Sequence, residues 1–234
     1  MIFETVFQCK ESDNKIIIPL DPDWNVLCIQ ASGGADSSLL TYMTIKLIQE
    51  HKLKTKIKIF TTNVATKPLY IEGARAVIRK IAEITGFDQW DRPHEYTIPF
   101  DESLNPMRKF SIRNHLKALA MTKQIDYEFN GTTKNPPDEA RKNFINDAFR
   151  QLDREGVTSI YGTGAYAQPL IICDKQGIFE MYKTYDLVDS ILPLTCSCDA
   201  DLAQITDGKF PCETKCWWCA ERAWGLAVNG IDAK

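Results

Sequence analysis

A glycine-rich heptapeptide, residues 32–38 (Ser-Gly-Gly-Ala-Asp-Ser-Ser), carries the groups that phosphate chemistry requires. Gly33 and Gly34 allow unusual backbone angles and leave the backbone N–H groups uncovered. Such N–H groups, together with the positive end of a following helix, favour an anion such as phosphate. The Asp36 carboxylate makes sense beside a phosphate mainly if Mg²⁺ lies between them. We therefore expect a phosphate group to be bound by Ser32, Gly33, Gly34, Ala35, Asp36, Ser37 and Ser38.

The residues on either side of this loop predict how it is positioned. An apolar run over 26–31 precedes it, and apolar residues at helical spacing over 39–47 follow it, so the order is strand, loop, helix. The simpler interpretation is a turn followed by a serine N-cap. The complete heptapeptide between a strand and a helix favours phosphate binding instead. The pattern resembles the pyrophosphatase loop (PP-loop) of the N-type ATP pyrophosphatases, and it is neither a Walker loop nor a Rossmann fingerprint.

Further strands are expected over 57–63, 94–100 and 127–131, with helices between them. This alternation predicts an α/β fold in which helices cover both faces of a doubly wound parallel sheet. Loops at the carboxyl ends of parallel strands then meet at one cleft. Residues 1–192 are expected to form this ATP-binding domain. Near its end we expect a hairpin at Gly177 and a short helix over 183–192.

Arg113 is a second candidate for anion binding. Ser111 is a plausible N-cap, which would place Arg113 and Asn114 in the first turn of a helix. A cation is disfavoured at the positive end of a helix. Arg113 is therefore either a surface residue at slight cost or a group that points at an anion on the side of the glycine loop.

Five of the eight cysteines crowd into the last forty residues: Cys196, Cys198, Cys212, Cys216 and Cys219. In a cytosolic chain such a cluster indicates metal binding rather than disulfides. Four thiolates suit one structural zinc ion, which would fold residues 193–234 into a small appendage. An iron–sulfur cluster and unligated buried cysteines are the alternatives. Cys196 and Cys198 cannot easily both bind, because alternate side chains of an extended chain point to opposite sides.

The composition limits the partners. The net charge is −3 and the pI about 5.7, so no global basic surface for nucleic acid is expected. No apolar run approaches the length of a membrane span. The first residues lack a basic start followed by an apolar stretch, so we expect no signal peptide and a cytoplasmic location.

Together, the PP-loop near the start and the cysteine cluster near the end resemble the 7-cyano-7-deazaguanine synthase family of queuosine biosynthesis. The resemblance includes Arg113-Asn114, Gly131 and the Pro137–Arg141 segment. It implies the adenine nucleotide alpha-hydrolase (PP-loop) fold, a homodimer and substrate binding by Asn114 and Lys183. It also implies a zinc ion bound by Cys198, Cys212, Cys216 and Cys219, with Cys196 in place of a tryptophan. Residues 61–65 depart from the family's Tyr-Gly-Gln-x-His element.

The resemblance implies an ATP-dependent ligase that converts 7-carboxy-7-deazaguanine and ammonia into the nitrile through adenylated intermediates. Asp36 would position Mg²⁺, and Arg113 would offset charge on phosphate or hold the substrate carboxylate. One alternative is a PP-loop tRNA sulfur transferase, which would need a basic surface and a reactive cysteine at the cleft. The other is a nucleotide-binding regulatory module without catalysis.

Overall fold

The computed structural model describes residues 1–64, 69–98, 108–142, 144, 154, 156–197 and 217–232. A five-stranded parallel sheet lies at the centre of the chain, in the order β5-β4-β3-β6-β7. Its strands are β3 (Val26–Gln30), β4 (Lys56–Val64), β5 (His94–Ile98), β6 (Tyr127–Phe129) and β7 (Tyr166–Ala167). A separate antiparallel hairpin is formed by β1 (Phe3–Gln8) and β2 (Lys15–Leu20).

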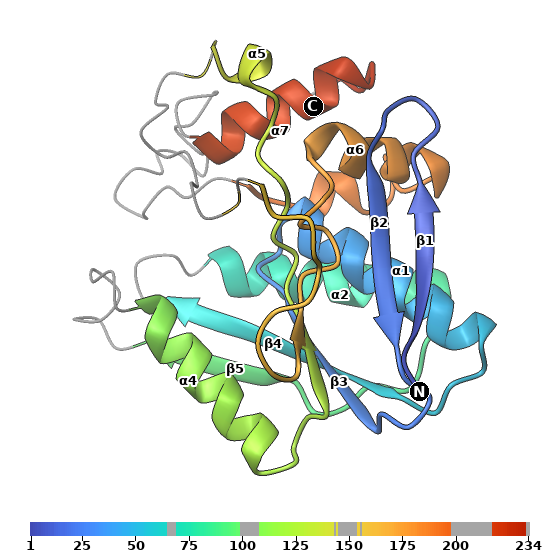
Figure 1. Cartoon of the computed structure of the whole chain (residues 1–234), viewed down its shortest axis with the longest axis vertical. Coiled ribbons are helices and arrows are strands. Elements are labelled where there is room, and N and C mark those ends of the chain that lie inside the picture. Colours follow the sequence, from blue (N-terminus) through green and yellow to red (C-terminus); the bar gives the residue numbers. More distant parts are fainter. Residues whose placement is uncertain are drawn as a thin grey trace.

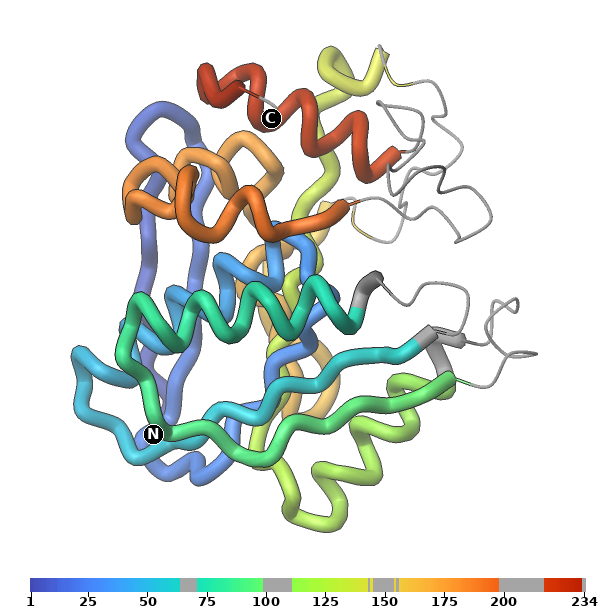
Figure 2. The backbone as a smooth tube through the Cα atoms, turned by 180° about the vertical axis from the view of Figure 1, so that it is seen from behind, coloured from blue at the N-terminus to red at the C-terminus, as the bar shows by residue number. Residues whose placement is uncertain are grey.

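Helices cover both faces of the sheet, as the alternation of strands and helices predicted (Figure 1). The helices are α1 (Ala35–Glu50), α2 (Leu69–Thr85), α4 (Arg108–Met121), α5 (Asp138–Arg141), α6 (Lys175–Thr184) and α7 (Trp217–Val228), with a 3₁₀ turn at Leu192–Leu194. α1 and α2 lie on one side of the sheet and α4 on the other, which the view from behind also shows (Figure 2). Within the described residues, none of these helices has both the length and the apolar character that crossing a membrane requires.

The apolar side chains form a large and a small core. The large core joins the sheet to α1, α2, α6 and the hairpin, and includes Leu27, Ile29, Leu40, Phe129 and Phe179. The small core lies under α4 and comprises Cys28, Phe60, Leu116, Leu119 and Ile125. Neighbouring residues of a strand point to opposite faces, so a single strand such as β3 contributes to both cores.

The strand order places a topological switch point between β3 and β6. From β3 the chain moves outward through β4 to β5, and then returns to pair β6 with the other edge of β3. The loops that follow β3 and β6 therefore leave the sheet beside each other, and ligands of open parallel sheets bind at such a point. The glycine loop is one of these two loops.

Two helix boundaries differ from the sequence-based expectation. α4 begins at Arg108, so Ser111 is inside the helix and not its N-cap. α6 spans Lys175–Thr184, so the expected hairpin at Gly177 and the expected helix over 183–192 are both wrong. Asp174 caps α6 by accepting hydrogen bonds from the backbone N–H groups of Gln176 (3.0 Å) and Gly177 (3.3 Å).

The described part of the C-terminal segment packs on the α/β domain. α7 lies along α6, and Leu226 of α7 belongs to the large core. Trp217, the first residue of α7, is buried. Residues 217–232 are therefore continuous with the domain that carries the glycine loop.

A substitution at Gly177 tests how tightly α6 packs against the β1–β2 hairpin. A Cβ atom added there would lie 2.5 Å from Asn14 Cβ and 2.5 Å from Cys173 Sγ. We expect Gly177→Ala to lower the free energy of unfolding by about 1–3 kcal/mol, measured by urea denaturation, because the added methyl group overpacks the site. Gly73 of α2 is the matched control, since nothing lies within 4 Å of a Cβ there. Gly73→Ala should stabilise the protein by about 0.5–1 kcal/mol; equal effects of the two substitutions would contradict this packing.

Candidate functional site

The glycine loop joins β3 to α1 and presents free backbone donors. Gly33 has a positive φ of 77°, and Gly34 is the N-cap of α1 without a side-chain cap among the described residues. The first intrahelical bond runs from Ser38 N to Gly34 O at 3.2 Å. The N–H groups of Ala35, Asp36 and Ser37 have no acceptor within the part of the chain that the structure describes. These N–H groups lie at the positive end of α1, which suits an anion.

The serine hydroxyls of the loop hold its own shape. Ser38 Oγ donates to Gly34 O at 2.7 Å, and Ser37 Oγ donates to the same carbonyl at 3.3 Å. Ser37 Oγ also accepts a hydrogen bond from Ser32 N at 3.3 Å. These short-range bonds order the loop before any ligand arrives, so the backbone donors are already directed.

Gly131 brings the loop after β6 against the start of α1. A Cβ atom at Gly131 would lie 3.0 Å from Ser37 N and 3.1 Å from Ser37 Cα. Asn130 fixes this loop, because its Oδ1 accepts the N–H of Thr132 at 2.8 Å. A side chain at residue 131 would crowd the donors of the helix end. The two loops of the switch point thus meet at the start of α1.

Asp36 is paired with a buried lysine that the sequence did not indicate. Lys175, the first residue of α6, directs Nζ at Asp36 Oδ2, and its side chain is only 5% exposed. The same Nζ lies 3.8 Å from Oε2 of Glu221 in α7. Gly225 makes this approach possible, because a Cβ there would lie 2.7 Å from Lys175 Cβ. One ammonium group therefore lies between two carboxylates from different helices.

The two carboxylates each keep one oxygen without a partner. Asp36 Oδ1 and Glu221 Oε1 are buried and make no hydrogen bond within the described residues. Burial raises the pKa of Glu221 to about 7, and Lys175 opposes that shift. Carboxylate oxygens are the ligands that Mg²⁺ prefers, so the free oxygen of Asp36 beside the helix end fits a Mg²⁺–phosphate group.

The structure separates three expected site residues from this cluster. Arg113 is the sixth residue of α4, so the expectation that it starts a helix is wrong. It is exposed, and its guanidinium carbon lies 6.0 Å from the ring centroid of Tyr166. Asn114 is exposed as well. Lys183 lies in the last turn of α6, where its Nζ is 3.4 Å from Glu11, whereas Lys175 of the same helix reaches Asp36.

The cysteine cluster is described only in part. Cys198, Cys212 and Cys216 lie outside the described residues, whereas Cys196 and Cys219 are partly exposed. Cys196 N donates to Gly33 O at 3.0 Å, so residues 195–197 lie against the glycine loop. Among the described side chains, no group of three or more potential metal ligands is found.

Arg222 of α7 binds the segment that precedes Cys196. Its guanidinium donates to Thr195 Oγ1 at 2.7 Å and to Leu192 O at 3.2 Å. Burial lowers the pKa of Arg222, and the thiols of Cys196 and Cys219 are close enough to oppose this shift. The Cys196 backbone therefore lies beside the loop, and Cys196 stays the alternative metal ligand that the sequence left open.

No protein-family model matches the chain, and no curated protein matches it either. Among solved structures the chain is similar to the U34-tRNA thiolase NcsA from Methanococcus maripaludis with its 4Fe–4S cluster, at 13% sequence identity and a TM-score of 0.46. The match covers 88% of this chain and 65% of the thiolase chain, so this chain spans less than two thirds of that protein's length. So distant a match shows neither a family nor an activity for this chain.

Lys175 can be tested by a double-mutant cycle with Glu221. We expect Lys175→Met to lower the free energy of unfolding by about 3 kcal/mol at pH 8, because it leaves the buried carboxylate of Glu221 and the partly buried one of Asp36 without their cation. Adding Glu221→Gln should restore about 1 kcal/mol or more, as expected for residues in contact. Urea denaturation measures all four proteins.

Lys183→Met is the matched control on the same helix, since the one ion pair of Lys183 within the described residues, with Glu11, is exposed. Its cost should stay below about 1 kcal/mol. A cost of Lys175→Met no larger than that of Lys183→Met would contradict the buried arrangement.

Proposed function

We propose that this chain is an ATP-dependent ligase that activates a carboxylate by adenylation. The observation that carries the proposal is a convergence at the switch point of a parallel sheet. Among the described residues, the N–H groups at the start of α1 and Oδ1 of Asp36 lack partners, and the buried ammonium of Lys175 lies beside them. The proposed substrates are ATP, 7-carboxy-7-deazaguanine and ammonia, and the product is 7-cyano-7-deazaguanine. This choice of substrate rests on the motif resemblance of residues 32–38 and of the cysteine cluster.

The chemistry answers a leaving-group problem, because carboxylate oxygen is expelled poorly. The substrate carboxylate attacks the α-phosphorus of ATP, and pyrophosphate departs. Ammonia then displaces AMP to give the amide. The amide oxygen then attacks the α-phosphorus of a second ATP, which releases pyrophosphate and one N–H proton, and departure of AMP with loss of the second N–H proton leaves the nitrile. Such steps need positioning and charge stabilisation more than a proton-transferring side chain.

Each group of the cluster has a role in this scheme. The N–H groups of residues 35–37 would hold the departing pyrophosphate. Lys175 would offset the charge that develops on it, and the free oxygen of Asp36 would hold Mg²⁺. Bound there, Mg²⁺ would neutralise phosphate charge and orient the phosphates. Arg113 would bind the anionic group of the acceptor, and Asn114 and Lys183 stay proposed substrate contacts.

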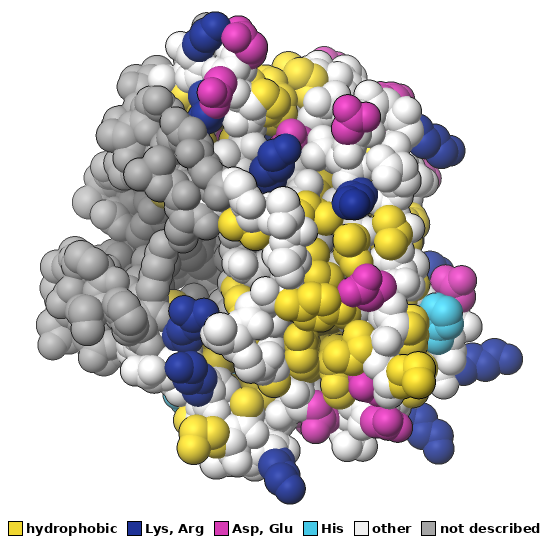
Figure 3. Space-filling model, viewed as in Figure 1, with side chains coloured by type: hydrophobic (Ala, Val, Ile, Leu, Met, Phe, Trp, Pro, Cys, Tyr) yellow, Lys and Arg dark blue, Asp and Glu magenta, His cyan; other side chains and the backbone are white. Residues whose placement is uncertain are grey.

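A tRNA sulfur transferase is the second candidate. The backbone contact of Cys196 with Gly33 favours it, because it brings a partly exposed cysteine residue to the glycine loop. The acidic composition speaks against it. On the face seen in Figure 3, Lys and Arg side chains lie among Asp and Glu over the upper and right parts, whereas those at the lower left, over α4, have no acidic neighbour in view. A regulatory module is the third candidate, although nucleotide binding alone does not require the Asp36–Lys175–Glu221 cluster.

The role of Asp36 is tested by Asp36→Asn. The variant should split ATP at least about a hundredfold more slowly, because the amide cannot hold Mg²⁺ as a carboxylate does. The measurements are pyrophosphate release and, by mass spectrometry, nitrile formation from ATP, ammonia and 7-carboxy-7-deazaguanine.

Asp189→Asn is the control, since Asp189 is exposed after α6 and should leave turnover unchanged. Unchanged turnover of Asp36→Asn would refute the site. Turnover by the wild-type protein only with tRNA and a sulfur donor would select the sulfur transferase instead.

The cysteine cluster gives a separate prediction. We expect about one zinc ion per chain by elemental analysis, and chelators should remove it only together with unfolding. The proposed ligands are Cys198, Cys212, Cys216 and Cys219, with Cys196 as the alternative to Cys198. An iron–sulfur spectrum after anaerobic purification would contradict the zinc and favour sulfur transfer. Size-exclusion chromatography of the same preparation tests the proposed homodimer.

A further inference from the structure

A polar pair occupies the α4 face of the sheet at the switch point. Gln30 ends β3, and Glu128 lies in the middle of β6, the neighbouring strand. Tyr127 and Phe129 point into the large core, so Glu128 between them points to the other face. Gln30 Nε2 donates to Glu128 Oε1. An amide and a carboxylate thus lie side by side on two central strands, where apolar residues would be the ordinary choice.

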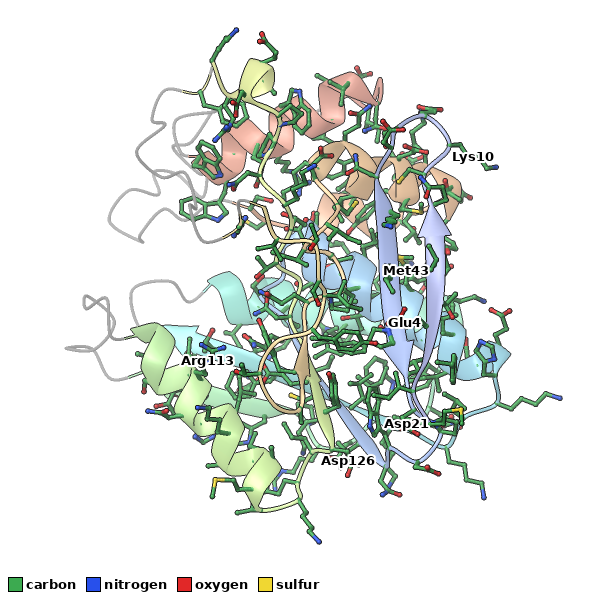
Figure 4. All side chains as sticks on the ribbon, viewed as in Figure 1. Glu4, Lys10, Asp21, Met43, Arg113 and Asp126 are labelled. Carbon is green, nitrogen blue, oxygen red and sulfur yellow. The ribbon has the colours of Figure 1, made fainter. Side chains whose placement is uncertain are left out.

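The pair keeps open hydrogen-bonding atoms. Gln30 Oε1 and Glu128 Oε2 have no partner within the part of the chain that the structure describes. Arg113 makes no ion pair or hydrogen bond there either, and its guanidinium carbon lies 6.0 Å from the centroid of the Tyr166 ring. Figure 4 shows Arg113 on the part of α4 nearest the end of β4. Two hydrogen-bond acceptors, from Gln30 and Glu128, and one cation, Arg113, are therefore available to a ligand on this face of the sheet.

Burial of Glu128 has a cost that the protein does not remove. Desolvation raises the pKa of Glu128 to about 7, and the hydrogen bond from Gln30 and the charge of Arg113 only oppose this shift. The two open oxygens of the pair can be reached from outside, because neither is among the fully buried side-chain atoms that lack a partner in the described part of the chain. A ligand that donates hydrogen bonds would supply what the fold leaves out.

The pair is also close to the glycine loop. Gln30 is two residues before Ser32, and Glu128 is three residues before Gly131, which touches the start of α1. At strand geometry, three residues span roughly 10 Å. A ring held by the pair could therefore present a substituent to a phosphate at the loop.

We infer that Gln30 and Glu128 are specificity-determining residues of the acceptor site, which read a planar heterocycle through two neighbouring N–H donors while Arg113 binds its anionic substituent. Two acceptors match a guanine-type edge, which offers N–H and NH₂ side by side. They mismatch an adenine-type edge, which offers one donor beside one acceptor. This assignment rests on the proposed function for its second substrate, whereas the polar pair itself is a feature of the sheet.

Binding without turnover tests the inference. Isothermal titration calorimetry of the full chain, saturated with a non-hydrolysable ATP analogue and Mg²⁺, would compare 7-deazaguanine with 7-deazaadenine. Wild-type protein should bind 7-deazaguanine at least about tenfold more tightly, because a mismatched edge leaves a polar group unpaired. Glu128→Gln, which keeps the shape and replaces one acceptor by a donor, should remove most of this preference. The affinity for the ATP analogue should change by less than about twofold.

Two further variants keep the result interpretable. Glu95→Gln changes a carboxylate of β5 that pairs with Arg75 at the surface, and it should leave the base preference intact. Gln30→Leu should weaken 7-deazaguanine binding even if Glu128→Gln folds poorly, and unfolding midpoints report folding for each variant. Absence of 7-deazaguanine binding by the wild type would overturn the inference. An equal loss of the ATP analogue and of 7-deazaguanine in Glu128→Gln would do so too, since the pair would then serve the adenine ring of ATP.

The outcome is independent of catalysis. If wild-type protein prefers 7-deazaguanine but does not split ATP, the acceptor site stands and the proposed ligase activity fails. If it splits ATP with another carboxylate and shows no base preference, the ligase chemistry stands and the assignment of Gln30 and Glu128 fails.

Discussion

A buried ammonium group between two carboxylates holds this structure together at its functional end. Lys175 of α6 lies between Asp36 of α1 and Glu221 of α7, and its side chain is almost completely buried. The ammonium of Lys175 would be costly there without a carboxylate beside it, because an unpaired buried charge is unfavourable. The cluster therefore fixes the start of α1 relative to the two helices that cover it, and so fixes the glycine loop.

The site gains its chemistry from this constraint. Lys175 holds one oxygen of Asp36, and the other oxygen has no partner among the described residues and lies beside the N–H groups that begin α1. Gly131 brings the second loop of the switch point to the same place. Donors, a carboxylate oxygen and a cation are thus preorganised around one anion-sized position, which is the arrangement that electrostatic catalysis at phosphate requires.

The local parts of this picture were predictable from the sequence, and the long-range parts were not. The glycine loop, the parallel sheet and the close approach of Gly131 follow from strand and helix patterns and from residue types with local consequences. The pairing of Asp36 with Lys175 joins residues 139 positions apart, and no periodicity encodes it. The sequence did offer a signal for the start of α6, because Asp174 is a good N-cap residue and precedes an apolar pattern over 178–182. That signal would have placed Lys175 in the first turn of a helix. Arg113 was misplaced because α4 continues upstream of its apparent cap at Ser111.

The central claim is that a substrate carboxylate attacks the α-phosphorus of ATP at this loop. Turnover of ATP and ammonia with 7-carboxy-7-deazaguanine labelled with ¹⁸O in its carboxyl group tests that step directly, with mass spectrometry of the nucleotide products. The account predicts that AMP acquires ¹⁸O from the substrate and that pyrophosphate stays unlabelled. Formation of ADP with labelled inorganic phosphate, or of AMP without label, would contradict it.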